Sequence, residues 1–130
     1  MSIQRVNDWI AYGKEAITQI GIDKNGQIDK TFRGQISSFG AAISMGNLKS
    51  AVAFFSQQAG ATVEREKLIC AIWYILQRAE GKKKEDIDVS EIDTGKIFDY
   101  VCDNDSIQLK NEFLDASVAI KLAMNLFDLV

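Results

Sequence analysis

Residues 32–55 have the sequence FRGQISSFGAAISMGNLKSAVAFF, and this stretch decides the fold class. In its first half, apolar residues recur at intervals of four, three and four, at Phe32, Ile36, Phe39 and Ile43. That spacing lines one face of an α-helix and does not fit a strand, whose faces alternate at every second residue. Gly46 predicts a left-handed helix stop, and Asn47 is placed to cap a second helix. We therefore expect two amphipathic helices joined by a tight turn.

The composition extends this prediction to the whole chain. The 130 residues suit one domain, 1–130, and are enough for a hydrophobic core without metal or disulfides. The apolar fraction of 47% and the charged fraction of 25% are ordinary for a globular protein. Proline, which breaks helices, is absent. We expect an all-α fold, a compact single-domain bundle of about six helices.

The helix boundaries follow from caps, glycines and apolar periodicity. We expect helices over residues 3–20, 30–45, 48–58, 63–80, 91–103 and 107–130. The predicted N-caps are Ser2, Asp29, Asn47, Thr62 and Ser106, and Ser90 with Asp93 resembles a capping box. The last helix has more apolar residues than one stripe requires, which indicates either central burial or a docking surface. Another helix packed closely against Gly40 would offset the low helix propensity of that glycine.

Several kinds of chemistry lack the residues that they need. Histidine is absent, so the commonest general base and metal ligand are both missing. The two cysteines, Cys70 and Cys102, are 32 residues apart, and we expect buried or half-buried reduced thiols rather than a zinc site. The turn at residues 23–26 does not match a calcium loop, and no phosphate-binding loop is present. We expect no enzyme activity, catalytic residue, cofactor, metal or small-molecule substrate.

The charge is divided unevenly between the two ends of the chain. Residues 1–84 contain 12 Lys or Arg and 7 Asp or Glu, a net charge of +5, whereas residues 85–130 contain 3 and 11, a net charge of −8. This division indicates two different partners, one partner and one repulsive face, or chance segregation on a solvated surface. The basic residues favour contacts with phosphate groups, which bind without reading base sequence. We expect Arg33 and Lys49 to project from one end of the predicted helix pair.

The helix pair resembles the small helical subunit of the type III-B CRISPR effector, the Cmr complex. The matching pattern is Phe32-Arg33, an apolar helix, a glycine turn followed by Leu48, and the Phe-rich segment AVAFF at residues 51–55. The wider layout is also similar, with a long first helix, an aromatic pair at Trp73-Tyr74 and a long apolar last helix. Two features depart from the family: helix two lacks the proline of many members, and glutamine rather than lysine follows the Phe-rich segment.

The resemblance implies an all-α, non-catalytic structural subunit in antiviral defence. Copies of such a subunit stack as a minor filament and support the duplex of guide RNA and target RNA through a basic face. The expected partners are other subunits of the complex, further copies of this chain, and the backbones of both RNAs. Arg33 and Lys49 carry over as nucleic-acid-binding residues, and Lys30 is added because it lies beside them in the sequence.

An alternative function is a helical protein–protein adaptor that makes no contact with nucleic acid. In that case surfaces around the last helix dominate, and charge reversal in the first half of the chain leaves assembly unchanged. We expect a cytoplasmic protein under either function, because the N-terminal sequence lacks a signal-peptide pattern. No membrane association is expected, because the longest apolar run, residues 68–76, is too short to span a bilayer.

Overall fold

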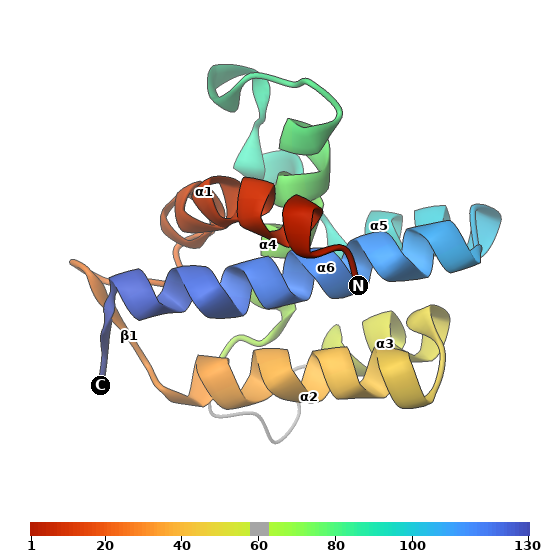
Figure 1. Cartoon of the computed structure of the whole chain (residues 1–130), viewed down its shortest axis with the longest axis horizontal. Coiled ribbons are helices and arrows are strands. Elements are labelled where there is room, and N and C mark those ends of the chain that lie inside the picture. The colour runs from red at the N-terminus through yellow and green to blue at the C-terminus, as the bar shows by residue number, and fades with distance from the viewer. Residues whose placement is uncertain (58–62) are drawn as a thin grey trace.

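The structure is a computed structural model that describes residues 1–57 and 63–130 of the chain. Over these residues it is an all-α bundle of six helices, which confirms the predicted fold class (Figure 1). The helices are α1 (Ile3–Ile20), α2 (Thr31–Met45), α3 (Leu48–Phe55), α4 (Glu66–Ala79), α5 (Thr94–Asp103) and α6 (Ile107–Ala123). The described residues also form the 3-10 helices η1 (Lys84–Asp86), η2 (Val89–Glu91) and η3 (Met124–Leu126), and the strands β1 (Gln27–Ile28) and β2 (Asp128–Leu129).

Helix α6 lies at the centre of the bundle, so the first of the two alternatives left open for the last helix, central burial, is the one that the structure bears out. It packs against α1, α2 and α4, and Figure 1 shows it passing between α1 and α2. Small residues allow these close approaches: a Cβ atom on Gly13 of α1 would lie 3.2 Å from the Ala119 carbonyl oxygen of α6. On the other side, a Cβ atom on Gly40 of α2 would lie 3.5 Å from Ser117 Oγ. Buried residues of all six helices join one hydrophobic cluster, which includes Ile17, Phe39, Val52, Ile72, Val101 and Phe113.

Most of the predicted helix caps are present. The side chains of Ser2, Asn47 and Ser106 accept hydrogen bonds from the backbone N–H groups three residues later, at 3.2, 2.8 and 3.0 Å. Asp29 is not the N-cap of α2, because that position is occupied by Lys30, one residue later than predicted. Asp29 Oδ1 still accepts from the Thr31 backbone N at 2.9 Å, and this hydrogen bond lowers the pKa of Asp29. Each of these oxygens satisfies a backbone donor that has no partner within its own helix.

Gly46 ends α2 for a different reason from the one predicted. Its φ of −126° is not in the left-handed region, so the predicted left-handed stop is wrong. The constraint is steric, because a Cβ atom on Gly46 would lie only 2.9 Å from the Ala42 carbonyl oxygen. That carbonyl accepts the Gly46 backbone N–H at 3.0 Å, which holds the turn tightly against the end of α2.

The junction between α3 and α4 also differs from the prediction. Helix α3 ends at Phe55 rather than at residue 58, and α4 begins at Glu66 rather than at residue 63. The cause is Arg65, whose buried side chain donates to the carbonyl oxygens of Phe54 and Gln57, both at 3.0 Å. These bonds satisfy carbonyls at the end of α3 that a longer helix would use itself. The predicted cap Thr62, and residues 58 and 60 at the predicted end of the third helix, lie outside the described residues.

The last helix is shorter than predicted and ends at Ala123. The residues that follow η3 form β2, which pairs in parallel with β1 in the register Gln27 with Asp128 and Ile28 with Leu129. Backbone hydrogen bonds from Asp128 N to Gly26 O at 3.0 Å and from Val130 N to Ile28 O at 2.9 Å extend this pairing. These bonds come from a segment a hundred residues earlier in the chain, which local periodicity does not reveal.

Helix α5 begins at Thr94 rather than at residue 91, because Asp93 and not Ser90 caps it. Asp93 Oδ1 accepts from the Gly95 backbone N at 3.4 Å. Asp88 holds Ser90 in a separate turn through bonds of 3.0 and 2.6 Å. In the described part of the chain no helix is both long and apolar enough to cross a membrane.

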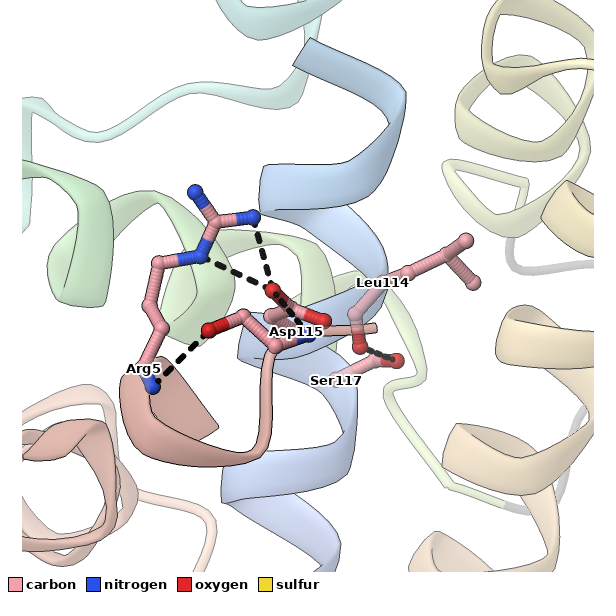
Figure 2. A network of polar contacts seen from close by, with 5 residues as sticks. Arg5, Leu114, Asp115 and Ser117 are labelled. Atoms are coloured by element: carbon pink, nitrogen blue, oxygen red, sulfur yellow. Dashed lines mark hydrogen bonds and ion pairs between the residues drawn. The ribbon is translucent and has the colours of Figure 1, made fainter. Parts of the chain in front are cut away.

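An ion pair between the partly exposed Arg5 and the buried Asp115 attaches the start of α1 to the middle of α6 (Figure 2). The Asp115 side chain is fully buried, and its Oδ2 accepts from Arg5 Nε at 2.8 Å and from Arg5 Nη2 at 2.7 Å. The Ser2 backbone N lies 3.3 Å from the same oxygen. A buried carboxylate needs such donors because its desolvation costs several kcal/mol.

Replacing Arg5 by Met should lower the free energy of unfolding by about 3 kcal/mol, because it leaves the Asp115 charge buried without its partner. Chemical denaturation of the purified chain measures this change. The double variant Arg5→Met, Asp115→Leu should recover most of the loss, since it removes both charges. A double variant less stable than Arg5→Met would contradict this account.

The two thiols differ more in exposure than the sequence predicted, because Cys102 is exposed whereas Cys70 is partly buried. Burial, together with the nearby carboxylates of Glu66 and Asp93, raises the pKa of Cys70 to about 11. At pH 8 only about one Cys70 thiol in a thousand is then ionised. A disulfide reagent should therefore modify Cys102 in the native chain at least about tenfold faster than Cys70. Reaction of Cys102→Ser and Cys70→Ser variants under the same conditions measures both rates, and equal rates would contradict the expectation.

Candidate nucleic-acid interface

Lys30 and Arg33 lie together at the start of α2. Lys30 is exposed and immediately precedes the helix, and its backbone N donates to the Val130 carbonyl oxygen at 3.0 Å. Arg33 is half-buried in the first turn of the helix, and its Nη1 donates to Asn125 Oδ1 on η3. The structure thus brings these two predicted residues to one end of the α2–α3 hairpin, with Arg33 oriented by the segment that follows α6.

Lys49 lies at the opposite end of the hairpin, so the prediction that it shares one end with Arg33 is wrong. Helix α3 starts where α2 stops, and α2 has 15 residues, a length of roughly 22 Å at about 1.5 Å per residue. Lys49 Nζ lies 4.0 Å from Asp105 Oδ2, with side chains 46% and 48% exposed. An ion pair this exposed contributes little to stability and competes weakly with another anion.

The α2–α3 hairpin is nevertheless uniformly basic. No Asp or Glu occurs between Asp29 and Glu64, so Lys30, Arg33 and Lys49 face no carboxylate from within the hairpin itself. Acidic residues gather instead between residues 85 and 105, where eight carboxylates accompany one lysine, Lys96. In Figure 1, α2 lies on one side of α6, and the loop after α4, where this acidic segment begins, lies on the other.

A shallow groove of about 200 Å³ runs between α2 and α6. On the α2 side it is lined by Ile36 and by four small residues, Ser37, Gly40, Ala41 and Ser44. On the α6 side it is lined by Leu114, Ser117, Val118 and Lys121. No carboxylate lines it, and Lys121 lies one helical turn before Asn125, the partner of Arg33. The groove therefore continues the basic surface from the start of α2 on to α6.

Lys121 is a candidate residue that the sequence did not single out. Lys110 and Lys121 are 11 residues apart, which is about three helical turns, so both lie near one face of α6. That spacing is visible in the sequence. The sequence does not reveal that α2 lies beside that face, because Arg33 of α2 and Asn125 after α6 are far apart in the chain and meet only in the fold.

Four other basic residues are engaged inside the protein. Arg5 pairs with Asp115, Arg65 caps α3, Lys67 pairs with Glu64 at 2.8 Å, and Arg78 pairs with Glu15 at 3.1 Å. Lys82, Lys83 and Lys84 are exposed, but they lie in the loop after α4, away from the hairpin. The candidate interface therefore consists of Lys30, Arg33 and Lys121 at one end and Lys49 at the other, with Lys110 on the α6 face between them.

The chemistry available at this surface is the binding of anions. In residues 1–57 and 63–130, no group of three or more Cys, Asp and Glu side chains is arranged to hold a metal ion. Comparisons of the chain with protein-family models, with curated proteins and with solved structures find no match.

Proposed function

We propose that this protein is a non-catalytic structural subunit of the type III-B CRISPR effector, the Cmr complex. In this role, copies of the chain stack beside other subunits of the complex and support the duplex of guide RNA and target RNA. The proposal joins the sequence resemblance of the hairpin to the charge distribution in the fold. The absence of histidine and of a phosphate-binding loop fits a subunit that holds RNA while others cut it.

The observation that carries the proposal is the basic surface formed by the α2–α3 hairpin and the adjoining face of α6. Lys30, Arg33 and Lys49 belong to a segment without carboxylates, and Lys121 lines the neighbouring groove. The α2 side of this groove consists mostly of Ser, Gly and Ala, with Ile36, so a sugar-phosphate strand can approach the helix closely there. The two ends of the hairpin are separated by about one helix length, which spans several phosphates of a strand.

Contacts of this kind suit a subunit that holds guides of any sequence. Double-stranded RNA is recognised mostly by its shape and its backbone, because its deep major groove is closed to side chains. Each exposed phosphate contact contributes roughly 1 kcal/mol or less. Several copies in one assembly along the same duplex add such contacts as avidity, so weak binding by a single copy is enough.

Charge reversal tests this proposal. The variant Lys30→Glu, Arg33→Glu, Lys121→Glu should weaken binding to a fluorescent guide–target RNA duplex at least about tenfold at low salt. The plot of log affinity against log salt concentration should also become less steep, by about one unit per lost contact. Fluorescence anisotropy at several salt concentrations measures both quantities. Lys49→Glu alone should have a smaller effect, because Asp105 already lies near Lys49.

The matched control reverses three lysines elsewhere, Lys82→Glu, Lys83→Glu and Lys84→Glu. This control has the same net charge as the first triple variant but leaves the hairpin unchanged, so binding should fall less than about threefold. If both triple variants lost the same RNA affinity, the loss would be explained by net charge alone, and the assignment of the interface would be refuted. Unchanged binding after reversal at the hairpin would refute RNA contact there.

The alternative function, a protein–protein adaptor without RNA contact, has one observation in its favour. Large apolar side chains are exposed where α2 ends and α6 begins, Met45 at 89% and Ile107 at 79%. Exposed apolar surface often marks a protein interface. If the adaptor function holds, Met45→Asp with Ile107→Asp should abolish co-purification of partner subunits while the triple reversal at the hairpin leaves it intact.

A further inference from the structure

A second surface, on the far side of α6 from the hairpin, combines aromatic rings with carboxylates. It is a hollow of about 180 Å³ between α1, α4, α5 and α6, called here the aromatic hollow. Its aromatic lining residues are Trp9, Trp73 and Tyr100, and its acidic lining residues are Glu80 and Glu112. Trp73 and Tyr100 are in edge-to-face contact, with ring centroids 5.0 Å apart.

The carboxylates of the aromatic hollow have no cationic partner in the described part of the chain. Neither Glu80 nor Glu112 forms an ion pair there, and no Lys or Arg is among the lining residues. Tyr100 is 39% exposed and Trp73 is half-buried, whereas Trp9 is buried, so the rings that are accessible from outside are those of Trp73 and Tyr100. The site therefore presents negative charge beside the electron-rich faces of aromatic rings.

The same protein uses this combination twice to hold an arginine. Arg5 lies 5.1 Å from the Trp9 ring centroid and pairs with Asp115. Arg78 lies 4.7 Å from the Tyr12 ring centroid and pairs with Glu15. An aromatic face and a carboxylate together attract a guanidinium group through its charge and its flat shape. In the aromatic hollow the Trp9 ring already holds Arg5, but in the described part of the chain no cation lies over Trp73 or Tyr100. Those two rings, with Glu80 and Glu112, supply both elements for a second cation.

We propose that the aromatic hollow binds an arginine side chain from a basic segment of a protein partner. The size fits one side chain, because pockets for drug-sized ligands usually have volumes of about 300–1,000 Å³. The surroundings fit a basic protein rather than a nucleic acid, since the segment between residues 85 and 105 has eight carboxylates and one lysine. That charge attracts a basic peptide and repels phosphate. This inference does not depend on RNA binding at the hairpin.

A neighbouring hollow indicates how the partner segment continues. It has a volume of about 260 Å³ and shares Trp73 and Gln77 with the aromatic hollow. Its charged lining residues are the four carboxylates Asp86, Asp88, Glu91 and Asp93 and the two lysines Lys82 and Lys96. Among the described residues that line this hollow only Trp73 is aromatic, and the two lysines compete with a second cation for the carboxylates. The arginine therefore belongs in the aromatic hollow, and the adjoining residues of the segment lie along the neighbouring one.

The test uses the full chain and a peptide with one arginine between glycines, acetylated and amidated at its ends. The peptide should shift the NMR signal of the Trp73 indole N–H, which is identified by its loss in Trp73→Phe. The same peptide with citrulline, which is neutral and nearly the same shape, should bind at least about tenfold more weakly. Equal binding of the two peptides would overturn the proposal, because the cation would then contribute nothing.

Two charge variants locate the site. Glu80→Gln with Glu112→Gln should weaken binding of the arginine peptide about fivefold to tenfold, with the helical circular dichroism unchanged. The control Glu85→Gln with Asp103→Asn removes the same charge from positions that line neither hollow, and should change affinity less than about twofold. Equal weakening in both variants would overturn the proposal in favour of diffuse attraction. A Trp73 shift produced by a short single-stranded RNA would overturn it in favour of base stacking.

Discussion

The buried carboxylate of Asp115 is the interaction on which the arrangement of the bundle depends. It lies inside the central helix, where its charge is tolerable only because Arg5 and the Ser2 backbone reach it from α1. This requirement positions the first turn of α1 across α6. The close approach at Gly13 then continues the contact toward the other end of α1, so the two helices have one mutual position.

With α1 and α4 against α6, α2 packs on another face of that helix. Gly40 on α2 and Ser117 on α6 face each other there, and a Cβ atom on Gly40 would lie 3.5 Å from Ser117 Oγ, an ordinary van der Waals contact. The α2–α3 hairpin then forms one side of the molecule. Because the hairpin itself contains no Asp or Glu, the surface that it forms carries only positive side-chain charges. The acidic segment between residues 85 and 105 begins on the other side of α6, but its second part, α5, packs against α3. Opposite charges are therefore separated at the start of α2 and meet at Lys49, which lies 4.0 Å from Asp105.

The packing also decides which basic residues are available to a partner. Arg5, Arg65 and Arg78 are used to neutralise a carboxylate or to satisfy helix carbonyls, and each also stacks on an aromatic ring. The sequence alone does not tell these arginines, which are engaged inside the protein, from Lys30 or Lys49, which are available to a partner. Lys121 shows the converse, because an isolated lysine in an apolar helix belongs to the candidate interface only through its position beside α2.

The sequence by itself determined the elements that depend on neighbouring residues. The helices, the turn at Gly46-Asn47 and the caps at Ser2, Asn47 and Ser106 follow from periodicity and from side chains that reach backbone groups three residues away. The tertiary structure alone decided the early end of α6, the late start of α4, the separation of Arg33 from Lys49 and the gathering of Trp9, Trp73 and Tyr100. In each case the partner is distant in the chain: β1 for the last residues, the α3 carbonyls for Arg65, and three different helices for the aromatic hollow. Local propensity carries no information about such partners, because they come together only when the apolar faces are buried.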